Sequence, residues 1–193
     1  QRAAAILAIP LLLSTLYLWM NGNEQNKVNF IEIRTNPGMI TSTILPDGTH
    51  VILNSNSTIV YPSHFDEKSR NVQLNGEAYF EVTKNSRQPF MVRTPQKAVV
   101  KVYGTQFNVE AYNENEFSTA LIQGSVKVTD KSQPDESVVL EPNNTVSLNN
   151  GKLTVTPITD FNPYSWKEGL ITFKDINFKD LMKFPVCGHH ELK

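Results

Sequence analysis

The feature that most constrains the fold is a strict alternation of apolar and polar residues over positions 72–82, V-Q-L-N-G-E-A-Y-F-E-V. The even-numbered positions are all small or apolar, whereas the odd-numbered ones include Glu77, Tyr79 and Glu81. Alternation with period two is typical of a β-strand that has one face in the core. We therefore expect a strand here whose Glu77, Tyr79 and Glu81 side chains face solvent.

Short apolar runs separated by turn residues continue along much of the chain. Pro46-Asp47-Gly48 suits a tight turn, because Pro presets φ, Asp can bond its own backbone and Gly adopts a left-handed conformation. Asn149-Asn150-Gly151 lies between two further apolar runs and is a second hairpin signal. About ten such strands without a helical period predict an all-β fold, a sandwich or a barrel, from about residue 30 to 157.

The segment 98–112, A-V-V-K-V-Y-G-T-Q-F-N-V-E-A-Y, changes parity along its length. Its apolar residues stand at even positions up to Val102 and at odd positions from Phe107 onward. One extra residue near Gly104-Thr105 would keep both sets in the core, which is the effect of a β-bulge. We therefore expect one bulged strand over this segment.

Residues 3–20 carry no charge. As a helix this run would span roughly 27 Å, close to the thickness of the hydrocarbon core of a bilayer. It ends in Tyr17-Leu18-Trp19-Met20, which resembles an interfacial aromatic belt, whereas a cleaved signal peptide ends in small residues. We expect a transmembrane helix over residues 1–20 followed by a polar tether over 21–34, in preference to a signal peptide or a buried core helix.

The composition changes again after Pro157. Residues 158–165 are predicted to be a linker, and residues 166–193 the start of a small α/β unit, with one strand and then one short helix. Such a unit cannot bury its apolar face alone. Its large apolar residues therefore form either its own core or an exposed surface that docks a partner by β-augmentation. The candidate partner-binding residues are Trp166, Phe173, Phe178 and Leu181.

The charge and the motifs point away from several functions. With 18 Lys plus Arg against 19 Asp plus Glu, the net charge of -1 gives no footprint for nucleic acid. No nucleophile elbow, phosphate loop or zinc helix motif occurs. Cys187, His189, His190 and Glu191 could together ligate a metal, but they lie in a terminal tail without the partners that orient a metal site. We expect no metal and no cofactor.

The two glutamates of the first strand leave one enzymatic alternative open. Glu77 and Glu81 share one strand face, because residues an even number of positions apart along a strand point to the same side. Glycosidases use two carboxylates that face one substrate, so a membrane-tethered carbohydrate-binding or hydrolase domain that uses Glu77 and Glu81 is the alternative function. A solvated strand face without catalysis is the preferred interpretation, because exposed glutamate is common.

Several motifs occur in a fixed order between residues 35 and 150, and together they resemble those of one family. They are L-P-D-G-T at 45–49, V-I-L-N-S-N-S-T-I-V-Y-P at 51–62, L-N-G-E-A-Y-F-E-V at 74–82, P-F-M-V-R-T at 89–94, V-Y-G-T-Q-F-N-V-E-A-Y at 102–112 and L-I-Q-G-S-V-K-V at 121–128. The chain thereby resembles the FecR family, whose members are membrane-anchored regulators of extracytoplasmic-function sigma factors in Gram-negative bacteria.

The resemblance implies a jelly-roll-like β-sandwich over residues 35–157 in a single-pass inner-membrane protein with a periplasmic C-terminal part. It implies a non-enzymatic anti-sigma factor that senses the signalling domain of a TonB-dependent outer-membrane receptor and reports to a sigma factor. The unit over 166–193 resembles the beginning of the family's small C-terminal domain. The cytoplasmic segment that binds the sigma factor is missing from this sequence and the C-terminal domain is expected to be truncated, so sigma binding by the chain alone is not expected.

Overall fold

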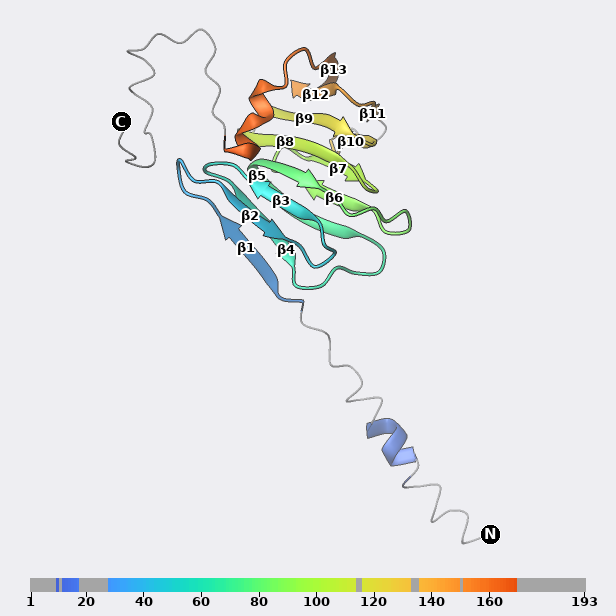
Figure 1. Cartoon of the computed structure of the whole chain (residues 1–193). Helices are drawn as coiled ribbons and strands as arrows, with labels where there is room; N and C mark the ends of the chain where they lie inside the picture. The colour runs from blue at the N-terminus through green and yellow to red at the C-terminus, as the bar shows by residue number, and fades with distance from the viewer. Residues whose placement is uncertain are drawn as a thin grey trace, which may run out of the picture.

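The chain folds into an all-β domain in the computed structural model, which describes residues 10, 12–17, 28–113, 116–132, 136–149 and 151–169. Thirteen strands and one 3-10 helix, η1, make up this domain within the described residues (Figure 1). The all-β class predicted from the sequence is confirmed. The elements are β1 (Phe30–Arg34), β2 (Thr41–Ile44), β3 (His50–Leu53), β4 (Thr58–Pro62), β5 (Arg70–Glu81), β6 (Phe90–Arg93), β7 (Ala98–Val102), β8 (Gln106–Asn113), β9 (Glu116–Gln123), β10 (Val126–Asp130), β11 (Ser137–Leu140), β12 (Asn144–Asn149), β13 (Lys152–Pro157) and η1 (Asn162–Glu168).

The transmembrane helix predicted over residues 1–20 lies largely outside the described residues. In the described part of this range, Leu12 to Tyr17 are helical. Across the described part of the chain, no helix has both the length and the apolar character that crossing a membrane requires. The tether predicted over residues 21–34 contains β1, which pairs with β4 from Phe30 to Arg34. Ordered sheet structure therefore starts before residue 35.

The long strand β5 connects two sets of paired strands. Its first half, Arg70 to Asn75, pairs with β4 and in parallel with β6. Its second half, from Gly76 to Glu81, pairs with β8 on one edge and, over part of its length, with β3 on the other. The first set continues as β6-β7-β10-β11 and the second as β8-β9-β12-β13 (Figure 1). Both sets thus depend on one strand.

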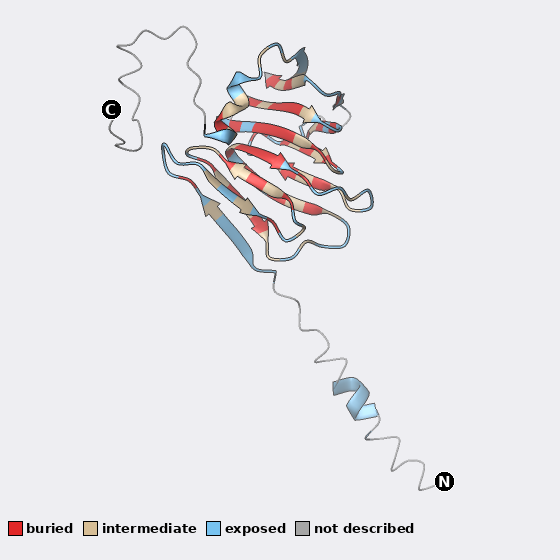
Figure 2. Cartoon of the chain, in the orientation of Figure 1, coloured by how far each residue is buried: buried red, intermediate tan, exposed pale blue. Residues whose placement is uncertain are grey.

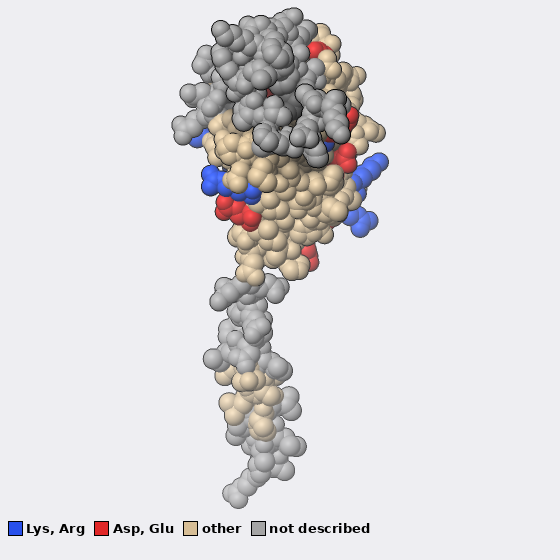
Figure 3. Space-filling model, turned by 60° about the vertical axis from the view of Figure 1, so that its left-hand side comes forward, with Lys and Arg blue, Asp and Glu red and all other residues tan. Residues whose placement is uncertain are grey.

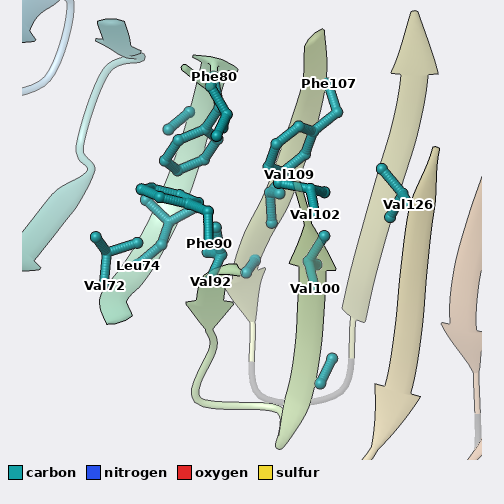
Figure 4. Packing of buried hydrophobic residues seen from close by; sticks show 14 of the residues in the cluster. Val72, Leu74, Phe80, Phe90, Val92, Val100, Val102, Phe107, Val109 and Val126 are labelled. Carbon is teal, nitrogen blue, oxygen red and sulfur yellow. The ribbon is translucent and has the colours of Figure 1, made fainter. Parts of the chain in front are cut away.

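The inward faces of both sets share one hydrophobic core. Buried residues alternate with less buried ones along β5 and its neighbours, as the sequence predicts (Figure 2). In the core, Phe80 of β5 stacks on Phe107 of β8 with ring centroids 5.1 Å apart, and lies 5.9 Å from Phe90 of β6 (Figure 4). These contacts join side chains from the two sets. The finer description as a jelly-roll-like sandwich remains a prediction.

The parity change over residues 98–112 has a different cause from the expected bulge. The segment forms two strands. β7 ends just before Tyr103-Gly104-Thr105, and β8 begins just after it. β7 pairs with β6 and β10 in the first set, whereas β8 pairs with β5 and β9 in the second. The chain crosses between the sets at Gly104, where φ is 149°. The prediction of one bulged strand was therefore wrong, although the residues expected in the core are buried.

Both predicted hairpin turns are confirmed. Gly48 has a φ of 81° between β2 and β3, and its N–H donates to the carbonyl of Leu45 at 2.9 Å. Gly151 has a φ of 75° between β12 and β13. The first turn is tied to β5 by a buried ion pair, since Arg70 Nη1 donates to Asp47 Oδ2 at 2.6 Å. Arg70 is 1% exposed, so this pair fixes the turn against the start of the shared strand.

Gly76 lies where β5 passes from one set to the other. Its φ is 107°, and a Cβ at this position would lie 2.4 Å from Ser57 Oγ and 2.6 Å from Ser57 Cα. The backbone of Ser57 therefore occupies the space that a side chain would need. Ser57 Oγ in turn accepts the N–H of Glu77 at 2.8 Å. Close packing of the β4 strand start against β5 thus requires glycine at this position.

The Gly76→Ala variant is expected to be much less stable than Gly48→Ala. Both positions have positive φ, and the left-handed strain at Gly48 costs about 1–2 kcal/mol. At Gly48 a Cβ would only touch Thr83 Oγ1 at 3.4 Å, whereas at Gly76 it would meet backbone, adding about 1–3 kcal/mol of overpacking. Urea unfolding of both variants measures the difference. Equal losses of stability would contradict the role given to the Ser57 contact.

Candidate functional site

The outward side of β5 is covered rather than open to solvent. Parity is as predicted, because Glu77, Tyr79 and Glu81 lie on the side opposite the core. Tyr79, however, is only 2% exposed and Glu77 is half-buried, while Glu81 is exposed. The expectation of a solvated face is therefore wrong for Glu77 and Tyr79. We call the surface formed by Glu77, Tyr79 and Asn108, with η1 above it, the covered face.

Glu77 is the centre of the covered face. Its Oε1 atom accepts the amide of Asn108 at 2.8 Å and the indole N–H of Trp166 at 3.0 Å. Its Oε2 atom accepts the amide of Asn54 at 2.6 Å. Three neutral donors from separate segments thus converge on one carboxylate. A hydrogen bond to a charged group contributes about 1.5–3 kcal/mol, so this arrangement joins β8, the β3–β4 loop and η1 to β5.

Trp166 and Lys167 bring η1 onto this face. Trp166 is 8% exposed, and its indole ring is buried while its N–H reaches Glu77. Lys167 places its Nζ atom 4.3 Å from the centroid of the Tyr79 ring, in a cation–π contact. A buried indole needs a partner for its N–H, and Glu77 provides it. The aromatic side chain of Tyr79 thus lies beneath the ammonium group of Lys167.

The local sequence explains why a single tight helix forms here. Pro163 stands in the first turn of η1, where its fixed φ favours a helical start. Gly169 ends the helix with a φ of 76°, and its N–H donates to the carbonyl of Trp166 at 2.9 Å. The hydroxyls of Tyr164 and Thr145 of β12 lie 3.4 Å apart. The residues 158–165 predicted as a linker thus include the first half of a helix that contacts the β-domain.

Of the four predicted partner-binding residues, only Trp166 is among the residues that the structure describes. Trp166 is buried against the β-domain, while Phe173, Phe178 and Leu181 lie outside the described residues. Sequence reasoning missed Asn54, Asn108 and Lys167, which complete the covered face. The weak signal for Asn108 is an amide at a polar position between the apolar residues of a strand. Nothing in the spacing of Trp166 and Glu77 links them, because they are far apart in the chain.

Glu77 and Glu81 have different surroundings and do not form a matched pair. Glu77 is held by three donors beneath η1, whereas Glu81 is exposed, and its Oε2 atom lies 3.7 Å from His50 Nδ1. A glycosidase pair needs both carboxylates free to face one substrate. The geometry therefore gives no support to the hydrolase alternative. No group that could hold a metal ion occurs among the described residues, and the cysteine and histidines of the C-terminal tail lie outside them.

Tyr112 of β8 lies at the margin of the covered face. Its hydroxyl donates to the carbonyl of Ser55 at 2.8 Å and accepts from Ser57 Oγ at 3.4 Å. Burial raises the pKa of Tyr112 above its ordinary value of 10.0. The hydrogen bond with Ser57 lowers the pKa by less than burial raises it, and the carboxylates of Glu77 and Glu110 each add a smaller increase. The neutral phenol is the form that the folded domain favours.

Comparison with known proteins places this fold in a regulatory class. It is similar to two crystal structures described as candidate anti-sigma factors from Parabacteroides distasonis. One, at 2.50 Å resolution, is 33% identical, with a TM-score of 0.68, and the match covers 79% of this chain and 71% of that chain. The other, at 1.65 Å, is 36% identical, with a TM-score of 0.66, and the match covers 72% and 65%.

The profile of the FecR protein family matches residues 31–127. The chain belongs to the FecR family. This confirms the resemblance drawn from the ordered motifs, and family membership implies a sigma factor as the partner class and a regulatory rather than an enzymatic role. Comparison with curated proteins gave no match.

Replacing Glu77 by Ala is expected to loosen η1 from the β-domain. The variant removes the acceptor of the Trp166 indole and leaves the amide of Asn108 without its partner, at a cost of about 1–3 kcal/mol per buried group. In a Trp19→Phe background Trp166 is the only tryptophan. Its fluorescence should shift to longer wavelength and become more accessible to a quencher.

The matched control is Glu81→Ala, which removes the same charge from the same side of β5. Glu81 is exposed and lies next to His50, whereas the Trp166 indole donates to Glu77, so the Trp166 emission should stay unchanged. An equal shift in both variants would mean that charge, rather than the hydrogen bond to Glu77, holds Trp166.

Tyr112 is expected to ionise at a higher pH than an exposed tyrosine. Because the folded-state pKa is raised, its contribution to stability is complete below the ordinary value of 10.0 and is lost as the pH rises through the folded pKa. Spectrophotometric titration of the chain and of Tyr112→Phe isolates this group. A difference spectrum that titrates at or below the ordinary value would contradict the effect of burial.

Proposed function

We propose that this chain is the transmembrane and periplasmic part of an anti-sigma factor that relays a signal from a TonB-dependent outer-membrane receptor to an extracytoplasmic-function sigma factor. FecR family membership supports the regulatory role and the sigma factor as final partner. The uncharged run over residues 3–20 supports a single membrane helix. Binding of the sigma factor is proposed for a cytoplasmic segment on the N-terminal side of the membrane helix.

The proposed arrangement has five parts along the chain. A membrane helix at 1–20 and a tether at 21–34 are followed by the β-domain at 35–157, a connection at 158–165 and the second unit at 166–193. In this arrangement the protein lies in the inner membrane with its C-terminal part in the periplasm. The connection is short and includes part of η1, so a load on the second unit would reach the β-domain directly.

The main structural support for the proposed relay is the hydrogen bond that the Trp166 indole donates to Glu77. It attaches the first residue of the second unit to the strand on which both sets of the β-domain depend. Lys167 adds a second contact, with Tyr79. A partner that binds the second unit would therefore pull on β5 through these two contacts. This gives the relay a defined mechanical connection.

The partner contact itself is proposed for Phe173, Phe178 and Leu181. Trp166 serves as an anchor to the β-domain instead, because its ring is buried there. Large aromatic side chains supply much of the binding energy of many docking surfaces, and the strand predicted in this unit would offer an edge for β-augmentation. The receptor's signalling domain is the proposed occupant.

Binding of the signalling domain from a receptor encoded beside this gene tests the proposal. The triple variant Phe173→Ala, Phe178→Ala, Leu181→Ala is expected to weaken binding by about 30-fold or more, since loss of a central apolar contact costs about 2 kcal/mol. Its matched control is Lys174→Ala with Lys179→Ala, which changes polar neighbours in the same segment. Biolayer interferometry with the 193-residue chain measures both affinities.

A chain that ends at residue 169 provides the second comparison. It keeps η1 and the Trp166 contact, so it should retain the thermal stability of the β-domain and lose receptor binding. Equal binding by the long and the short chain would remove the second unit from the mechanism. In cells, a protein with the triple variant and an intact cytoplasmic segment should leave a sigma-dependent reporter unresponsive to the receptor's ligand.

A further inference from the structure

A basic cleft lies on the outer side of the first set of strands, away from the covered face. Its volume is about 320 Å³. Lys84, Lys101 and Lys127 line it together with Tyr103 and Ser125, and no acidic residue is among the residues that line it. We call it the lysine cleft. The three lysines come from the β5–β6 loop, β7 and β10.

Two of these lysines face each other directly across a pair of strands. Lys101 of β7 and Lys127 of β10 are register partners in an antiparallel ladder. Like charges in directly opposite positions are destabilising. The other register partners are neutral, Met91 for Lys101 and Val139 for Lys127. No ion pair within the described residues involves either lysine, so their repulsion is not offset there.

Lys84 is held next to this pair by backbone contacts. The N–H of Val82 donates to the carbonyl of Thr105 at 3.0 Å, and the N–H of Asn85 donates to the carbonyl of Tyr103 at 2.7 Å. A Cβ on Gly104 would lie 2.7 Å from Lys84 Cα. The loop that carries Lys84 therefore packs tightly against the crossing between β7 and β8. The backbone of Lys84 is thereby held at the cleft that Lys101 and Lys127 also line.

A side-chain hydrogen bond also connects the β7–β8 crossing to β10, and the aromatic ring of Tyr103 lines the cleft. Thr105 Oγ1 donates to the carbonyl of Ser125 at 3.0 Å, which ties the β7–β8 crossing to the start of β10. Tyr103 is 44% exposed, and Lys101 Nζ lies 5.4 Å from its ring centroid. The cleft thus combines three lysines with a partly exposed aromatic ring.

This concentration of positive charge is local. The chain has a net charge of -1, and the face drawn in Figure 3 carries acidic and basic side chains close together. A mixed surface gives little attraction for anions in general. A cleft without acidic residues, built from three segments, therefore has a distinct electrostatic character.

We propose that the lysine cleft binds a ligand through a phosphate group. A phosphate monoester carries a charge of about -1.5 to -2 at neutral pH, which matches several lysines better than a single carboxylate does. Lysine binds phosphate as a compact point charge, and the bound anion would offset the repulsion between Lys101 and Lys127. The Tyr103 ring gives the organic part of such a ligand, for example a sugar, an apolar surface. This proposal does not depend on the receptor relay.

Isothermal titration of the 193-residue chain with glucose 6-phosphate, inorganic phosphate and glucose tests the proposal. Glucose 6-phosphate or inorganic phosphate should bind, more weakly at higher salt, and glucose alone should not. Lys101→Gln and Lys127→Gln should each weaken phosphate binding by about ten-fold, because a charge-assisted hydrogen bond contributes about 1.5–3 kcal/mol. Tyr103→Ala should weaken binding only of the sugar phosphate, which distinguishes the two sources of the anion.

The double variant Lys101→Gln with Lys127→Gln removes both facing lysines of the cleft. Its charge-matched control is the double variant Lys68→Gln with Lys152→Gln. Neither control lysine lines the cleft, and both doubles change the net charge equally. The cleft double should unfold at the same or a higher temperature, because it removes a like-charge pair. Absence of binding by every phosphate probe, or an equal loss in both doubles, would overturn the proposal. Single variants give the same answer if the double does not fold.

Discussion

The β-domain depends on hydrogen bonds along a single strand. β5 supplies partners for one set of strands with its first half and for the other with its second half, so neither set is complete without it. This arrangement needs a point where the chain can change direction without a side chain, and Gly76 against Ser57 is that point. The buried pair of Arg70 with Asp47 fixes the beginning of the strand. The shared core then follows from the alternation of residues along it.

The same strand positions the two features that bear on function. On its outward side it presents Glu77 and Tyr79 to η1, which connects the β-domain to the chain that follows. Beyond its end, the loop that contains Lys84 packs on the crossing at Gly104 and contributes to the lysine cleft. The two surfaces are formed by different parts of the chain. Events at one need not displace the residues of the other.

The sequence predicts the local features well, because they depend on neighbouring residues. The alternation over 72–82 and the turns at Gly48 and Gly151 are examples. It fails where distant segments meet. The parity change over 98–112 arises because β7 and β8 join different partners, and Tyr79 is buried because η1 folds back over it. The parity change does not tell which strands pair, and nothing in the residue spacing links Tyr79 to η1. A strand face expected in water therefore proved to be covered.

The burial of Trp166 against the β-domain changes the position at which the folded domain ends. The strands end with β13 at Pro157, which looks like the natural place to cut. A fragment ending there would lose η1 and leave the Tyr79 ring and a half-buried carboxylate facing water. Exposed aromatic surface of this kind promotes self-association. The smallest soluble unit should therefore extend to Gly169, where the left-handed cap of η1 closes the last turn.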